Sequence, residues 1–172
     1  ALLAEKPLKE KTALYKHSTG LFEVIESLFA EGNSIEALAL IRRNWGNLLA
    51  CGADTLYEGM YAAEYPDITK RNTECRAPHI SFCHGWTAGP CCLLPSEIAG
   101  IKPAEPGFRR FTVKPDPVDL TSFRTVVPTP HGEIALVLEN GVYTLLVPAG
   151  TEAEVIRGGK TFRFGAGCHS FD

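Results

Sequence analysis

Apolar residues near the start of the chain recur at the spacing of a helix with one buried face. The stripe is formed by Leu21, Val24, Ile25, Leu28 and Phe29. Positions i, i+3, i+4 and i+7 lie on one side of an α-helix, so this pattern predicts an amphipathic helix. Ser18 or Thr19 can cap its start, and Gly32 can end it.

A second predicted helix follows directly. Asn33 with Glu36 three residues later resembles a capping box, and the stripe is Leu38, Ile41, Trp45, Leu48 and Leu49. Two helices joined at Gly32-Asn33 would form an αα-hairpin. Trp45 lies in the middle of the stripe, which predicts a core residue that packs with Leu38, Ile41 and Leu49.

The middle of the chain loses this periodicity. Pro66, Pro78 and a mixture of charges between Cys51 and Ser81 predict a long irregular loop. Loops of this length are uncommon in a compact domain unless they shape a site. Helical spacing returns from His84 to Ile98. Pro90 and Pro95 each remove a backbone donor there, so we expect an interrupted helix that ends at Gly100.

Short runs with β-propensity take over after Pro106, separated by turn residues such as Asn140-Gly141 and Gly158-Gly159. The chain is therefore predicted to be α+β, helical over residues 1–105 and a small antiparallel β-sandwich over residues 106–172. The predicted strands are Phe108–Val113, Ser122–Val127, Glu133–Leu138, Val142–Val147, Glu152–Ile156 and Thr161–Phe164.

The segment Val127-Pro-Thr-Pro-His-Gly132 places a histidine beside a threonine, a pairing that is also found in catalytic sites. Its prolines and glycine fit a rigid turn that leads into a strand better. We therefore predict a structural role for His131.

Composition limits the possible partners and location. The 172 residues are 45% hydrophobic and 22% charged, which predicts a folded chain, and the net charge of −3 makes nucleic acid an unexpected partner. No apolar run reaches the roughly 20 residues that cross a bilayer, which predicts a water-soluble chain, secreted or cytoplasmic, with no membrane partner. The chain opens with Ala1 rather than Met, which suggests a processed chain or a piece of a longer one.

The cysteines give little sign of a metal site. They form no CxxC pair and no regular spacing with histidine, so we expect no metal and no cofactor. Buried free thiols are the ordinary interpretation, although Cys75 and Cys83 are near enough in sequence for one disulfide. The six cysteines are Cys51, Cys75, Cys83, Cys91, Cys92 and Cys168.

Four segments resemble, in this order, the end of the α-L-rhamnosidases of glycoside hydrolase family 78. The segments are Ala37-Leu-Ala-Leu-Ile-Arg-Arg-Asn-Trp-Gly46 with Gly52-Ala-Asp-Thr-Leu-Tyr-Glu58, Ser81-Phe-Cys-His-Gly-Trp-Thr-Ala-Gly-Pro90, Gly100-Ile-Lys-Pro-Ala-Glu-Pro-Gly-Phe-Arg-Arg-Phe-Thr-Val-Lys-Pro115 and Val127-Pro-Thr-Pro-His-Gly-Glu-Ile134. The resemblance implies that residues 1–105 are the last helices of an (α/α)6 six-hairpin barrel. Residues 106–172 would then be the C-terminal β-sandwich.

The resemblance also assigns roles to individual residues. It implies that Glu58 is the general base and that His84 contacts the sugar at its subsite. On spacing alone, Glu58 would be a solvated residue at a helix end and His84 a local capping group. Tyr57 and Trp86 can stack on a pyranose face, but each can equally be a core residue.

Two functions follow from this resemblance. The first is hydrolysis of terminal α-L-rhamnose from a glycoside or polysaccharide with inversion, which requires a second carboxylic acid about 6.5–9.5 Å from the base. In the family the acid lies in sequence that this chain lacks, so the remainder of the barrel or another chain would be a partner and the isolated chain would be inactive. The second is a non-catalytic module that binds carbohydrate or protein.

Overall fold

The computed structural model describes residues 18–50, 53–58 and 81–172. The chain divides into two compact units, Ala1–Pro90 and Cys91–Asp172, and each is described by itself below. The predicted irregular loop between Cys51 and Ser81 lies mostly outside the described residues, as do the side chains of Ser18 and Thr19.

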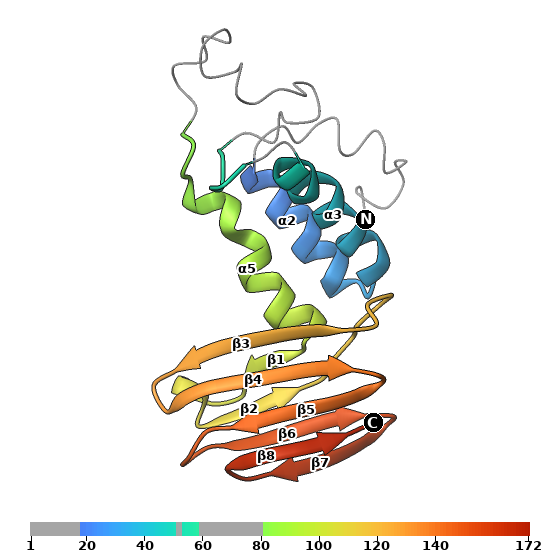
Figure 1. Cartoon of the computed structure of the whole chain (residues 1–172), viewed down its shortest axis with the longest axis vertical. Helices are drawn as coiled ribbons and strands as arrows, with labels where there is room; N and C mark the ends of the chain where they lie inside the picture. Colours follow the sequence, from blue (N-terminus) through green and yellow to red (C-terminus); the bar gives the residue numbers. More distant parts are fainter. Residues whose placement is uncertain (1–17, 51–52, 59–80) are drawn as a thin grey trace, which may run out of the picture. The chain divides into compact units, whose positions relative to one another are not determined.

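The first unit contains the predicted αα-hairpin, with α2 at Ser18–Ala30 and α3 at Ser34–Ala50 (Figure 1). The turn between them uses Gly32 with a φ of +79°, and the Asn33 amide donates to the Leu28 carbonyl at 2.8 Å. A left-handed glycine with a backward bond of this kind is a common way to end a helix. The prediction of two helices joined at Gly32-Asn33 is confirmed.

The buried face of α3 agrees with the predicted stripe at every position except its last. Trp45 is buried and Leu48 is 2% exposed, but Leu49 is 71% exposed, so its predicted place in the core is wrong. Ala37 and Leu40 are also buried. Because successive residues turn by about 100°, these two shift the centre of the buried face away from Leu49.

The interrupted helix is confirmed as three short pieces. A 3₁₀ turn η2 spans Gly85–Ala88, α5 spans Gly89–Leu93, and a π-helical turn η3 spans Leu94–Ile98. Pro90 and Pro95 both fall within these pieces, where a missing backbone donor favours a change of helix type. Gly100, with a φ of +70°, follows the last piece. A Cβ there would lie 2.0 Å from the Lys114 carbonyl oxygen, so only glycine allows this close approach.

The second unit holds two four-stranded sheets with the orders β1-β2-β6-β7 and β3-β4-β5-β8 (Figure 1). The second sheet is antiparallel throughout, but β2 pairs with β6 in parallel, which corrects the expectation of a purely antiparallel sandwich. The strands are β1 Ile101–Pro103, β2 Arg110–Val113, β3 Phe123–Thr129, β4 Gly132–Glu139, β5 Val142–Val147, β6 Glu152–Arg157, β7 Lys160–Phe164 and β8 Gly167–Phe171.

All six predicted strands are present, and two further strands were not predicted. β1 has only three residues and ends in proline, and β8 has the sequence Gly-Cys-His-Ser-Phe, without a clear apolar alternation. Strands this short, or this exposed, carry little periodicity for a sequence pattern to detect. The Asn140-Gly141 turn joins β4 to β5 as predicted, with φ values of 51° and 80° that match a type I′ hairpin turn.

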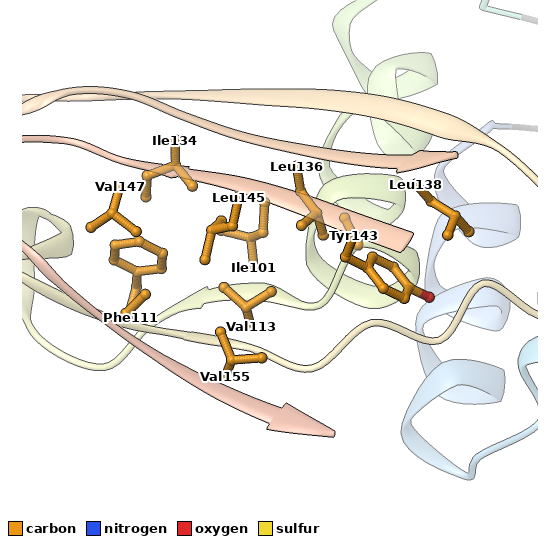
Figure 2. Close-up of a cluster of buried hydrophobic side chains, with 12 residues drawn as sticks. Ile101, Phe111, Val113, Ile134, Leu136, Leu138, Tyr143, Leu145, Val147 and Val155 are labelled. Carbon is orange, nitrogen blue, oxygen red and sulfur yellow. The ribbon is translucent and has the colours of Figure 1, made fainter. Parts of the chain in front are cut away.

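The sandwich closes its own core. Side chains from both sheets interdigitate between the layers, as Figure 2 shows for Phe111, Val113, Leu136 and Leu145. All four are fully buried. At about 25 cal/mol per Å² of apolar surface removed from water, such a cluster supplies most of the stabilisation of a small unit.

Two further predictions have opposite outcomes. His131 lies in the β3–β4 turn, where its amide donates to Thr129 Oγ1 at 3.1 Å, so the predicted turn is confirmed. The expectation of buried thiols is wrong for the described cysteines, because Cys83, Cys91, Cys92 and Cys168 are all exposed. Cys51 and Cys75 lie outside the described residues, and with them the possible bridge to Cys83.

Candidate functional site

Two segments far apart in sequence are joined by backbone hydrogen bonds at the end of α3. The Glu58 amide donates to the Ser81 carbonyl at 2.9 Å, and the His84 amide donates to the Leu56 carbonyl at 2.7 Å. Thr55 Oγ1 also bonds the Phe82 carbonyl. The structure therefore brings the Glu58 and His84 segments together.

The Glu58 carboxylate is part of this junction. Its Oε2 accepts a hydrogen bond from the Ser81 amide at 2.9 Å, so Glu58 and Ser81 are linked in both directions. The side chain is half-buried, and no lysine or arginine of the described residues forms an ion pair with it. The bond to Ser81 occupies one carboxylate oxygen and holds the group in a fixed orientation.

Tyr57 lies on the packed side of the junction. Its side chain is 7% exposed, and its ring meets the Phe82 ring edge-on with centroids 4.9 Å apart. Its carbonyl accepts a 2.6 Å hydrogen bond from Thr87 Oγ1, and the Thr87 carbonyl accepts one from Trp45 Nε1 at 2.7 Å. The middle of α3 thus fixes the loop that carries Glu58.

The side chains of His84 and Trp86 are in contact. The two rings meet edge to face, with centroids 5.3 Å apart and planes at 84°. His84 Nε2 is buried and has no hydrogen-bond partner among the described residues, whereas Trp86 is 66% exposed. The exposed Trp86 ring can contact the apolar face of a ligand, and the buried His84 nitrogen lies next to that ring without a partner among the described residues.

Ser81 and Thr87 were not singled out from the sequence. Both act through groups that leave no periodic pattern: Ser81 through its backbone, and Thr87 through one hydroxyl that is fully buried. Their presence inside the segment Ser81–Pro90 is the only signal that could have pointed to them. In the part of the chain that the structure describes, no group of three or more His, Cys, Asp or Glu residues is placed to hold a metal ion.

Comparison with known proteins gives the following. Residues 100–162 match the family model "Bacterial alpha-L-rhamnosidase C-terminal domain". A comparison with curated proteins gave no significant match. Over the described ranges, no helix is long and apolar enough to cross a membrane.

Solved structures give a consistent result. One similar structure is the Streptomyces avermitilis alpha-L-rhamnosidase complexed with L-rhamnose. The match covers 89% of this chain and 17% of the rhamnosidase chain, with 22% sequence identity and a TM-score of 0.70. The match to the alpha-L-rhamnosidase from Dictyoglumus thermophilum covers 89% of this chain and 20% of that chain, with 18% sequence identity and a TM-score of 0.69. The match to the GH78 family rhamnosidase of Bacillus sp. GL1 covers 76% of this chain and 13% of that chain, with 34% sequence identity and a TM-score of 0.52. The chain spans at most a fifth of each of these three structures.

Proposed function

We propose that this chain, which belongs to the alpha-L-rhamnosidases as the C-terminal portion of one, supplies one wall of a rhamnoside-hydrolysing site. The observation that supports this most is that backbone hydrogen bonds join the Glu58 segment to the His84 segment. The Glu58 carboxylate accepts a hydrogen bond from the Ser81 amide, and the joined segment also carries His84 and the exposed Trp86.

In the proposed mechanism Glu58 is the general base. Water is a poor nucleophile at neutral pH, so attack at the anomeric carbon needs a carboxylate that takes a proton as the bond forms. The Ser81 amide holds Oε2, which leaves Oε1 to accept the proton of that water. The general acid, on the opposite face of the sugar, comes from outside this chain, and the product is inverted.

The neighbouring residues have separate roles in this proposal. His84 contacts terminal α-L-rhamnose at its subsite, and the exposed ring of Trp86 packs against the C–H face of the sugar. Tyr57, although predicted from the sequence as a stacking residue, positions the loop, because its side chain is buried against Phe82.

The helical unit also needs a partner to complete the site. Its described part exposes several large apolar side chains, Ile35, Leu49, Phe82 and Trp86. Exposed apolar surface on this scale is typical of a face that another element covers. We propose that the remaining helices of a six-hairpin barrel, from the same polypeptide or another chain, cover it and bring the acid.

The test uses the assembled enzyme with an aryl α-L-rhamnoside. Glu58→Gln keeps the shape and removes the basicity, so kcat should fall at least about 100-fold while L-rhamnose affinity, measured calorimetrically, stays within a few fold. Glu133→Gln, at an exposed carboxylate of β4, is the matched control and should leave kcat unchanged.

Two results would contradict the proposal. Near-normal turnover by Glu58→Gln would remove this residue from the mechanism. Proton NMR during the reaction should show β-L-rhamnose as the first product, and α-L-rhamnose first would exclude inversion. An assembled protein that binds rhamnose and hydrolyses no rhamnoside would favour the alternative function, a non-catalytic binding module.

A further inference from the structure

A hollow of about 550 Å³ lies on the β-sandwich unit at the Asn140-Gly141 hairpin. It is formed by the hairpin with the strand ends on either side, by the segment that precedes β3, and by Arg157 at the end of β6. The size is within the range of small-molecule sites, and all of its walls belong to the second unit.

The Tyr143 hydroxyl is the unusual feature of this hollow. The Tyr143 ring is buried in the sandwich, stacked on Phe171 with centroids 5.2 Å apart, and Tyr143 also lines the hollow. Figure 2 shows its oxygen directed away from Phe111, at the end of the core where Leu138 lies. The hydroxyl has no hydrogen-bond partner among the described residues. A buried hydroxyl without a partner is energetically unfavourable, and a bound ligand could offset this cost.

Arg157 provides a second polar group, and it is held in place. Its guanidinium lies over the Tyr143 ring, 4.9 Å from the centroid, and its Nε donates to the Asp172 carbonyl at 3.2 Å. Two contacts on one side chain reduce the entropy that a ligand must remove when it binds. The hollow is therefore partly preorganised.

The charges of the lining are balanced. Arg157 contributes one positive charge and Glu139 one negative charge, and the remaining polar groups include Ser122 and Asn140. Burial raises the pKa of Tyr143, an effect that Arg157 opposes and Asp116 reinforces, so the hydroxyl stays neutral at physiological pH. Leu138 adds an apolar patch to the wall.

From these contacts we propose that the hollow binds a residue of a neutral saccharide. The Tyr143 hydroxyl and the Arg157 guanidinium would bond adjacent sugar hydroxyls, Glu139 would accept from a third, and Leu138 would pack against the C–H face of the ring. The Glu139 carboxylate would repel an anionic sugar, so we expect the neutral class to bind more tightly. This proposal does not depend on Glu58 or on catalysis.

The test is a ¹H–¹⁵N NMR titration of the full 172-residue chain with L-rhamnose, D-glucose and D-galacturonate as separate probes. At least one of the two neutral sugars should shift the amides of Ser122, Asn140, Gly141 and Arg157 saturably, and D-galacturonate should bind at least about tenfold more weakly. Tyr143→Phe removes only the hydroxyl and should weaken the neutral sugar about tenfold or more. Glu139→Gln should weaken it several fold, while Glu133→Gln, at the other end of β4, should not.

Several results would overturn the proposal. Absence of saturable shifts with both neutral sugars would exclude the site, and equal or tighter binding of D-galacturonate would exclude the neutral class. Unchanged affinity in Tyr143→Phe would exclude the role of the hydroxyl. Thermal unfolding of that variant without sugar should match or exceed the wild type, which shows that weaker binding does not come from misfolding.

Discussion

The two units of this chain differ in how completely each buries its own apolar surface. The sandwich encloses a core of fully buried side chains from both sheets, and its exposed large apolar residues are only about 41–42% exposed. In the described part of the helical unit, Ile35, Leu49 and Trp86 are 66–75% exposed. The sandwich therefore buries its apolar side chains more completely than the described part of the helical unit does.

The two units also differ in which of them carries the candidate site. The sandwich derives its stability from apolar contacts that need no partner. The helical unit carries the candidate carboxylate and histidine, and its described part also exposes large apolar side chains. Under the proposed function, helices outside this chain would cover the exposed apolar side chains and complete the site.

The largest expected effect on stability is in the sandwich core. Phe111 is fully buried between the sheets, so Phe111→Ala should lower the free energy of unfolding by about 3–5 kcal/mol. The measurement is urea unfolding followed by the far-UV circular dichroism of the strands. A loss below about 1 kcal/mol would contradict the claim that the sandwich depends on this core.

A smaller effect is expected in the helical unit from Thr87→Val, which keeps the side-chain volume and removes the hydroxyl. The Tyr57 carbonyl would lose its 2.6 Å bond, which should cost about 1–3 kcal/mol. Both tryptophans of the chain, Trp45 and Trp86, belong to the first unit, so tryptophan fluorescence reports its unfolding directly. An unchanged fluorescence midpoint would show that Thr87 does not hold the Glu58 loop.

A third prediction concerns pH and belongs to the sandwich. Burial raises the pKa of Tyr143 above the ordinary value of 10.0, so the folded state holds its proton more tightly than the unfolded state does. This contribution to stability is complete below about pH 10 and is lost as the pH rises through the raised value. Tyr143→Phe should flatten that part of the pH–stability curve, and an identical slope in the variant would exclude Tyr143 as its source.

The smallest expected effect concerns the exposed side of α3, where two adjacent leucines can be compared. Leu49→Ala should change the stability of this chain by less than about 0.5 kcal/mol, because Leu49 is 71% exposed. Leu48→Ala, at a side chain that is 2% exposed, is the matched control and should cost about 2–5 kcal/mol. In the assembled barrel the cost of Leu49→Ala should rise above 1 kcal/mol, and no rise would mean that other helices do not cover Leu49.

Local patterns along the chain were enough to predict the type and approximate position of most elements. The stripe from Leu21 to Phe29 and the Asn140-Gly141 turn are local patterns, and local patterns depend on spacing along the chain alone. The order of the quoted segments likewise pointed to the rhamnosidases without any coordinates. Glu58 and His84 came only from that resemblance, since their spacing carries no periodic signal.

Which side chains contact one another could not be predicted from these patterns. The parallel pairing of β2 with β6, the exposure of Leu49 and the burial of Tyr57 all depend on contacts between residues distant in sequence. So do the bond from Ser81 to Glu58 and the unpartnered hydroxyl of Tyr143. A pattern along one chain records which face of an element is apolar, but the partner that covers that face is set by packing in three dimensions.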